Sequence, residues 1–255
     1  MTSLTSADTE RAGGASSWKG LIIQPAAIVV VLIGFVIWLN TAEISATEAN
    51  TLAPDRILQY LGEHLALTFV AAAFVLVIAI PLGVLLTRKA FVKARGPILA
   101  VANFGQSAPA IGLIVLLAFW LGFGFWAAIV ALVLYAVLPV LRNTMLGLTA
   151  VDERLIEAGR GMGMSAASVL LRVELPLAVP IMLTGIRTAL VLLVGTATLA
   201  AFINGGGLGL LITTGVNLYL TNVLVAGSLL VALLALAIDW LGRLVEHIAT
   251  PKGLS

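Results

Sequence analysis

LALTFVAAAFVLVIAIPLGVLLT, residues 65–87, is an apolar run that contains no charged side chain. A helix rises about 1.5 Å per residue, so about 20 apolar residues cross the hydrocarbon core of a bilayer. Further runs of comparable length occupy residues 21–39, 98–121, 124–141, 178–203 and 222–242. The sequence therefore predicts an all-α, polytopic membrane protein with six transmembrane helices.

The overall composition supports this fold class and excludes several kinds of chemistry. Of the 255 residues, 61% are hydrophobic and 10% are charged, whereas about 25% of residues are charged in soluble domains. Because the chain has no cysteine, disulfides, thiolate metal sites and cysteine nucleophiles are excluded. The net charge of +2 is too small to indicate a nucleic-acid partner. His64 and His247 have no neighbours at ligand spacing, so we expect no metal site.

The basic residues fall mainly into the loops on one side of the predicted membrane helices. Short cytoplasmic loops collect Lys and Arg. If the runs alternate across the bilayer, one side holds Arg11, Lys19, Arg88, Lys89, Lys93, Arg95, Arg142, Arg154, Arg160, Arg172, Arg243 and Lys252. The other side holds Arg56 among several acidic residues. We therefore expect a multi-pass protein of the cell (inner) membrane with both termini in the cytoplasm. Residues 1–17 are expected to be a disordered cytoplasmic tail, and residues 18–255 the transmembrane domain.

The connection between the fourth and fifth runs, at about residues 150–176, is amphipathic and lies on the basic side. Acidic residues open it, and residues 154–164 can form a short helix on which Leu155, Ala158 and Met162 share a face. A second amphipathic stretch covers residues 166–174 and is expected to stop at Leu175-Pro176. Such a loop on the cytoplasmic side needs an explanation beyond membrane crossing.

Within this loop, a spaced set of residues resembles the EAA loop of ABC importer permeases. The set is Glu157, Ala158 and Gly159, then Gly163 after three residues, and after nine more Val173, Glu174, Leu175 and Pro176. The family pattern is E-A-A, three residues, G, nine residues and I-x-L-P, so Gly159 and Val173 are small departures. The resemblance implies that residues 154–164 dock in a cleft of a cytoplasmic ATPase and pass its closure to the membrane helices. Coupling residues are then Glu157, Ala158, Gly159, Gly163, Leu175 and Pro176.

From His64 onward the chain is similar to permeases of the osmoprotectant uptake branch, which imports glycine betaine, choline, carnitine and related compatible solutes. The most distinctive segments are Gly195 to Ala200 (GTATLA) and residues 251–254 (PKGL). The resemblance implies a type I ABC importer permease fold without catalytic residues. It also implies cytoplasmic ABC ATPase subunits that use ATP, a second permease subunit that is identical or homologous, and an external solute-binding protein. No cofactor is expected on this chain.

The third apolar run is interrupted by three polar residues and a proline, which are Asn103, Gln106, Ser107 and Pro109. Polar side chains that face lipid are costly, so these should face protein or a water-filled path. Two interpretations stay open. Gln106 and Ser107 could line the solute path beside a helix distorted at Pro109, or they could form hydrogen bonds between helices.

Two opposite charges lie in the last two runs, Arg187 in the fifth and Asp239 in the sixth. Because these spans are consecutive and antiparallel, both residues should sit in the cytoplasmic half, within reach of each other. An unpaired charge at that depth is costly. We expect an ion pair beside the inner mouth of the solute path, the alternative being that each side chain reaches the headgroups separately.

Nucleotide binding, secondary transport and enzymatic catalysis are the functions that compete with the importer. The glycine-rich segment 204–209 lacks the Gly-Lys-Ser/Thr of a phosphate loop and lies on the external side, so we expect a tight or re-entrant loop there. A secondary transporter would suit six spans but needs no ATPase-docking loop. A membrane enzyme would need paired carboxylates, a metal site or a nucleophile with a base, and the acidic residues of the spans are few and scattered. An importer permease for another small solute also remains open.

Overall fold

The computed structural model describes residues 18–249, so residues 1–17 and the 251–254 segment lie outside the described part. Residues 18–249 fold into helices without any strand. The long helices are α1 (Trp18–Thr41), α3 (Pro54–Thr87), α6 (Phe125–Thr149), α9 (Leu175–Ala197) and α11 (Thr221–Ala249). The shorter elements are α2 (Ala46–Thr51), η1 (Lys89–Phe91), α4 (Val92–Ser107), α5 (Ala110–Leu121), α7 (Glu153–Gly161), α8 (Ala166–Val169), the π-helical turn η2 (Leu170–Glu174), η3 (Thr198–Ile203) and α10 (Gly209–Asn217).

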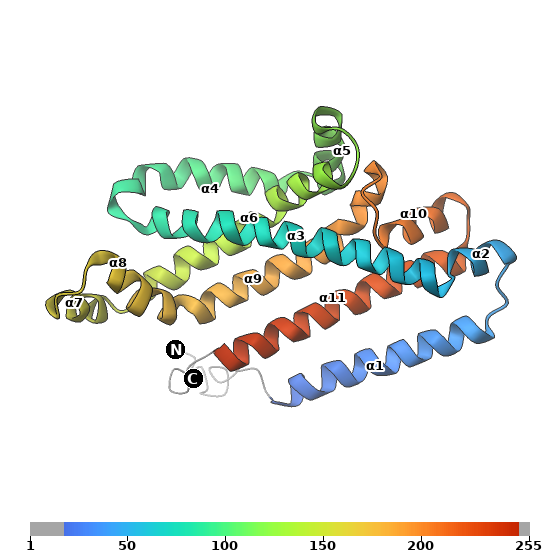
Figure 1. Ribbon diagram of the computed structural model, residues 1–255, viewed down its shortest axis with the longest axis horizontal. Coiled ribbons are helices and arrows are strands. Elements are labelled where there is room, and N and C mark those ends of the chain that lie inside the picture. Colours follow the sequence, from blue (N-terminus) through green and yellow to red (C-terminus); the bar gives the residue numbers. More distant parts are fainter. Residues whose placement is uncertain (1–17, 250–255) are drawn as a thin grey trace, which may run out of the picture.

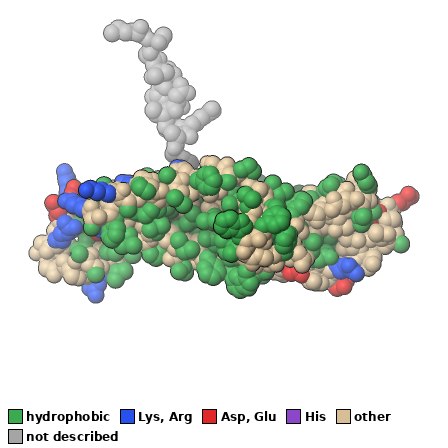
Figure 2. Space-filling view, turned by 90° about the horizontal axis from the view of Figure 1, so that it is seen from above, with side chains coloured by type: hydrophobic (Ala, Val, Ile, Leu, Met, Phe, Trp, Pro, Cys, Tyr) green, Lys and Arg blue, Asp and Glu red, His purple; other side chains and the backbone are tan. Residues whose placement is uncertain are grey.

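The helices form one elongated bundle with two distinct ends (Figure 1). We call the end that holds α7, α8 and η1 the coupling end, and the end that holds α2 and α10 the far end. α1 begins and α11 ends on the side that faces the coupling end, short of α7 and α8. Figure 2 shows Lys and Arg side chains gathered at this end, with a broad hydrophobic belt across the middle of the bundle. This arrangement is that of a polytopic membrane protein, and it places the basic loops together as predicted.

The core of the bundle forms where α6 packs between α3 and α9. Leu67, Leu132 and Leu193, one from each helix, are completely or almost completely buried there. Glycines let the helices approach closely, as is common between membrane helices. A Cβ atom on Gly185 of α9 would lie 2.5 Å from the Cβ of Asn143 on α6. The crossing of α6 and α9 therefore requires glycine at this position.

The third predicted span is not a single straight helix. α4 and α5 are bent by 103° across the break between Ser107 and Ala110. Pro109 lacks the N–H that a continuous helix would need and disfavours helical backbone in the residue before it. The expected distortion at Pro109 is confirmed, and it is larger than a kink. The described residues thus contain five helices that could each cross a membrane, or six spans if the bent pair counts as one.

The expectation that Leu175-Pro176 ends a helix is wrong. The chain stays helical from Ala166 to Ile203. The reason is the π-helical turn η2, in which the Leu175 N–H bonds to the Leu170 carbonyl five residues back. The wider turn lets the helix continue through Pro176, which stands in the first turn of α9. Residues 150–176, which we call the coupling loop, are therefore joined to the rest of α9 without a flexible break.

A short helix at the far end, α2, is fixed by a capping box. The Ser45 side chain accepts the Glu48 N–H, and the Glu48 carboxylate accepts the Ser45 N–H at 2.9 Å. Glu48 also accepts the Asn222 N–H at the start of α11. The backbone hydrogen bond from Ser45 lowers the pKa of Glu48 below its usual range.

Candidate coupling site and polar clusters

The short helix predicted over residues 154–164 is present as α7, although it ends earlier, at Gly161. Local sequence explains both of its ends. The Asp152 carboxylate accepts the Arg154 N–H at 2.9 Å and caps the first turn. At the other end the Gly163 N–H bonds to the Arg160 carbonyl, and Gly163 has φ +81°. Only glycine adopts this left-handed backbone without strain. Gly163 therefore sets the direction in which the chain leaves α7.

The two sides of α7 have different surroundings. Gly159 is buried, and a Cβ atom there would lie 3.4 Å from Val169 and 3.8 Å from Val173, which is ordinary contact. The other side presents apolar side chains to the outside, with Leu155 48% and Met162 77% exposed. Glu157 and Ala158 are exposed as well. An exposed apolar face bordered by charges, on a helix that is held from behind, has the properties of a protein docking surface.

An ion pair at the base of the loop, in which Glu174 is buried and Arg88 is half-buried, was not predicted from the sequence. Glu174, the last residue of η2, is only 4% exposed. Its two oxygens accept hydrogen bonds from the two terminal nitrogens of Arg88, at 3.1 and 2.6 Å. Such a two-pronged contact fixes geometry as well as charge. The available signal was an acidic residue between the apolar motif positions Val173 and Leu175.

The expected pair between Arg187 and Asp239 is confirmed and belongs to a larger cluster. Arg187 Nε lies 3.7 Å from Asp239 Oδ1, and another Arg187 nitrogen lies 2.9 Å from Glu246. Asp239 also contacts Arg243 at 2.9 Å and accepts a hydrogen bond from Gln24 of α1. The cluster therefore joins α1, α9 and α11.

The structure does not bring the other predicted path residues to this cluster. Gln106, Ser107 and Pro109 lie at the break between α4 and α5, half-exposed or exposed. Within residues 20–249, no hydrogen bond or ion pair connects them with Arg187 or Asp239. The break and the charged cluster are thus two separate polar regions of the bundle.

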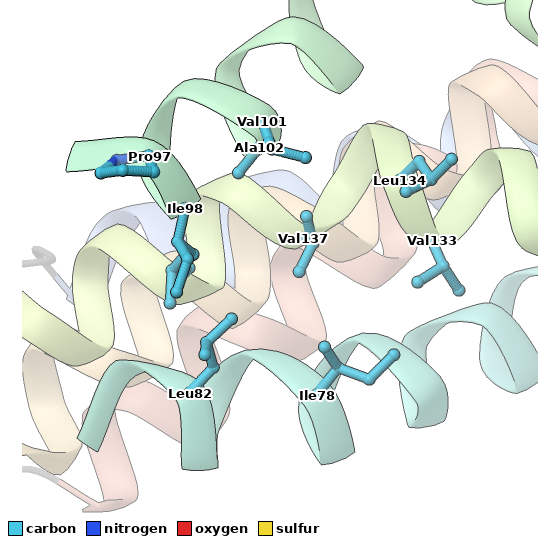
Figure 3. Close-up of a pocket in the computed structure, with 10 residues that line it drawn as sticks. Ile78, Leu82, Pro97, Ile98, Val101, Ala102, Val133, Leu134 and Val137 are labelled. Carbon is cyan, nitrogen blue, oxygen red and sulfur yellow. The ribbon is translucent and has the colours of Figure 1, made fainter. Parts of the chain in front are cut away.

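A groove of about 340 Å³ between α3, α4 and α6 has an almost wholly apolar lining (Figure 3). The lining residues are Ile78, Leu82, Pro97, Ile98, Val101, Ala102, Val133, Leu134, Val137 and Leu141. None of the predicted path residues is among them. Its lining offers nothing that would hold a charged solute, and it suits hydrocarbon.

At the far end, the start of α3 contacts the glycine loop, which we define as residues 204–209. The Glu63 carboxylate accepts the Gly207 N–H at 2.9 Å, and His64 Nε2 lies 3.0 Å from the Val194 carbonyl of α9. His64 is completely buried. Gly206 and Gly207 have φ +83° and +87°. The predicted tight loop is therefore present.

Metal binding has no support in this part of the chain. No cluster of three or more His, Asp or Glu side chains that could hold a metal ion occurs in the described residues. His64 bonds to a backbone carbonyl and has no acidic partner in ligand geometry. The polar regions of the bundle are thus ion pairs, caps and helix-to-loop hydrogen bonds.

Comparison with known proteins agrees with this geometry. The permease protein OpuCB of a Bacillus subtilis glycine betaine/carnitine/choline transport system is 43% identical over 193 residues, which are 76% of this chain and 88% of the relative. The B. subtilis choline transport permease OpuBB is 42% identical over 192 residues, 75% of this chain and 88% of the relative. The Salmonella typhimurium osmoprotectant import permease OsmW is 39% identical over 197 residues, 75% of this chain and 91% of the relative.

A solved structure and a family model extend the match. The inward-facing MetNI methionine ABC transporter has a chain with a TM-score of 0.67 and 29% identity, covering 76% of this chain and 96% of that one. The model of the binding-protein-dependent transport system inner membrane component matches residues 79–247, which include the coupling loop. The chain belongs to this family, the membrane-spanning permeases of ABC importers.

Proposed function

We propose that this chain is the permease subunit through which an ATP-driven importer brings a compatible solute, such as glycine betaine, choline or carnitine, into the cell. The observation that carries the proposal is α7, a capped docking helix with the spacing of the EAA loop at the basic end of a membrane bundle. Relatives named for osmoprotectant, choline and carnitine transport support the solute class.

The coupling end is the cytoplasmic end in this proposal, and both termini lie on that side. Basic residues gather there, as the positive-inside rule expects of cytoplasmic loops. The far end then faces outward, with α2 and the glycine loop available to an external solute-binding protein. Its acidic residues and Arg56 fit the side that is poor in positive charge.

The partners follow from this orientation. ABC ATPase subunits dock on α7 through the face that contains Leu155, Glu157 and Met162 and hydrolyse the ATP themselves. Gly159 and Gly163 fix α7 against the loop, and Leu175 and Pro176 carry its movement into α9. A second permease subunit, identical or homologous, completes the path. This chain itself holds no cofactor and does no covalent chemistry.

The path across the membrane uses the two polar regions. The α4–α5 break, with Gln106, Ser107 and Pro109, leaves backbone groups free that need protein or water as partners. Arg187 and Asp239 stand beside the inner mouth. Because their charges are neutralised within one cluster, they can border an aqueous path without a large penalty.

The proposal is tested by purifying the permease with its ATPase and binding protein and reconstituting the complex in liposomes. Uptake of labelled betaine, choline, carnitine, proline and ectoine is measured with and without ATP inside. We expect ATP-dependent uptake of at least one of these solutes, and loss of that uptake in Glu157→Lys. Uptake that follows an ion gradient and needs no ATPase would contradict the proposal in favour of a secondary transporter.

A further inference from the structure

Helix α3 runs from one end of the bundle to the other and makes two long-range polar contacts, one directly after its last residue and one at Glu63, in its far half. Its 34 residues span roughly 50 Å at about 1.5 Å per residue. The helix is continuous through Pro81, and it is buried against α6 along much of its length. A continuous, well-packed helix can transmit displacement between its ends.

At the coupling end, α3 contacts the C-terminal part of the coupling loop. Arg88 follows the last residue of α3, and Glu174 stands between the docking segment and α9. The two-pronged Arg88–Glu174 contact is nearly dry on the Glu174 side, which is 5% exposed. Breaking one member of such a pair leaves a buried charge without compensation. The contact therefore resists separation of α3 from the loop, because Glu174 would lose the partner of its buried charge.

At the far end, α3 is tied to the glycine loop. The Glu63 carboxylate accepts the Gly207 N–H and is oriented by a hydrogen bond from Gln59. A Cβ atom on Gly206 would lie 2.6 Å from a Glu63 oxygen, so the carboxylate sits where only glycine leaves room. This loop connects the helical rod that ends in η3 with α10. A shift of α3 along its axis would pull on the loop directly.

We propose that Arg88 and Glu174 are positioning residues that make α3 move together with the ATPase-docking loop, and that Glu63 passes this movement to the glycine loop on the external side. The proposal rests on the proposed docking of an ATPase at α7. When the ATPase binds nucleotide, the resulting movement of α7 then reaches the glycine loop through α3 as well as through α9. Neither the Arg88–Glu174 pair nor the Glu63–Gly207 contact takes part in binding the ATPase.

The test is hydrogen exchange of the whole complex in lipid nanodiscs, with and without a non-hydrolysable ATP analogue. In the unmodified complex we expect the ATPase to protect peptides of α7, and peptides covering 204–209 to change their exchange rate with nucleotide. In Arg88→Gln we expect α7 to stay protected, while the nucleotide response of 204–209 shrinks by at least about fivefold, the low end of typical coupling between sites. Glu63→Gln should weaken the same response without altering α7.

Two further variants separate coupling from folding. The double variant Arg88→Gln/Glu174→Gln leaves no lone charge, so a complex that assembles but still lacks the response supports the proposal. The exchanged pair Arg88→Glu/Glu174→Arg should restore the nucleotide response of residues 204–209. Arg95→Gln, an exposed basic residue of α4, is the matched control and should change nothing.

The outcomes distinguish this proposal from the one on which it rests. If α7 gains no protection from the ATPase in the unmodified complex, the docking proposal fails. If α7 is protected and the glycine loop responds to nucleotide equally in the unmodified, Arg88→Gln and double-variant complexes, the role of α3 is refuted.

Discussion

Gly159 and Gly163 belong to the same motif, and the structure predicts opposite results for replacing each with alanine. Gly163 has φ +81° with no atom within 4 Å of the added Cβ, so its penalty is purely one of backbone conformation. Gly159 is helical, and its added Cβ would make ordinary contacts at 3.4 Å or more. Gly159→Ala also restores the second alanine of the family pattern.

The expected magnitudes follow from these conformations. A left-handed conformation costs about 1–2 kcal/mol for a residue with a Cβ, and a free-energy change of 1–2 kcal/mol is a factor of roughly 5–30 in an equilibrium. Gly163→Ala should therefore speed hydrogen exchange in the last turn of α7 by about 5- to 30-fold. Gly159→Ala should slow it, because alanine favours a helix over glycine by up to about 1 kcal/mol.

The assay is hydrogen exchange of residues 153–164 in the purified chain, followed by ATP-driven uptake in the reconstituted complex. Uptake should fall in Gly163→Ala and be retained in Gly159→Ala. Equal acceleration of exchange in both variants would refute the structural reasoning, since it would mean that Gly159 also lacks room for a methyl group or that α7 ends elsewhere.

Three other predictions concern the bundle and the far end. Gly185→Ala should lower the free energy of unfolding by about 1–3 kcal/mol, because the added Cβ overlaps α6. Thermal melting in detergent measures this loss. The control is Gly34→Ala, because Gly34 has open space around it. Arg187→Ala and Asp239→Ala should be non-additive by about 0.5–3 kcal/mol in a double-mutant cycle of melting data, and additive losses would contradict direct coupling. The pKa of Glu48 is lowered by its capping-box N–H bond. Its stabilisation of α2 is therefore present above its ordinary pKa of 4.5 and is lost as the pH falls through the lower folded value. Hydrogen exchange of the α2 amides should accelerate on acidification, and Glu48→Gln should show a weaker pH dependence.

The membrane helices and the docking helix could be predicted because their signals are local. Apolar length and charge placement locate spans, and Asp152 and Gly163 mark the ends of α7. The limits of the helices were harder to predict. α11 extends to Ala249, beyond the predicted run, and this is why Glu246 was missed as a partner that lies closer to Arg187 than Asp239 does.

Long-range contacts could not be predicted from spacing. Arg88 and Glu174 are 86 positions apart, and their meeting depends on how α3 packs beside the end of the coupling loop. The complete burial of His64 is also a long-range effect, because its Nε2 lies 3.0 Å from the Val194 carbonyl of α9. The continuation of the helix through Pro176 likewise depends on the π-helical turn at Leu170–Glu174, which no residue pattern predicted.

The most direct test of the central account is site-specific cross-linking of α7 to the ATPase in membranes. Because the chain has no cysteine, a single introduced cysteine is unique in it. Leu155→Cys lies on the exposed face of α7 and Tyr219→Cys, 92% exposed, lies at the far end. We predict that Leu155→Cys cross-links to a cysteine in the ATPase cleft and that Tyr219→Cys does not. A cross-link from Tyr219→Cys, with none from Leu155→Cys, would contradict both the docking site and the orientation of the chain in the membrane.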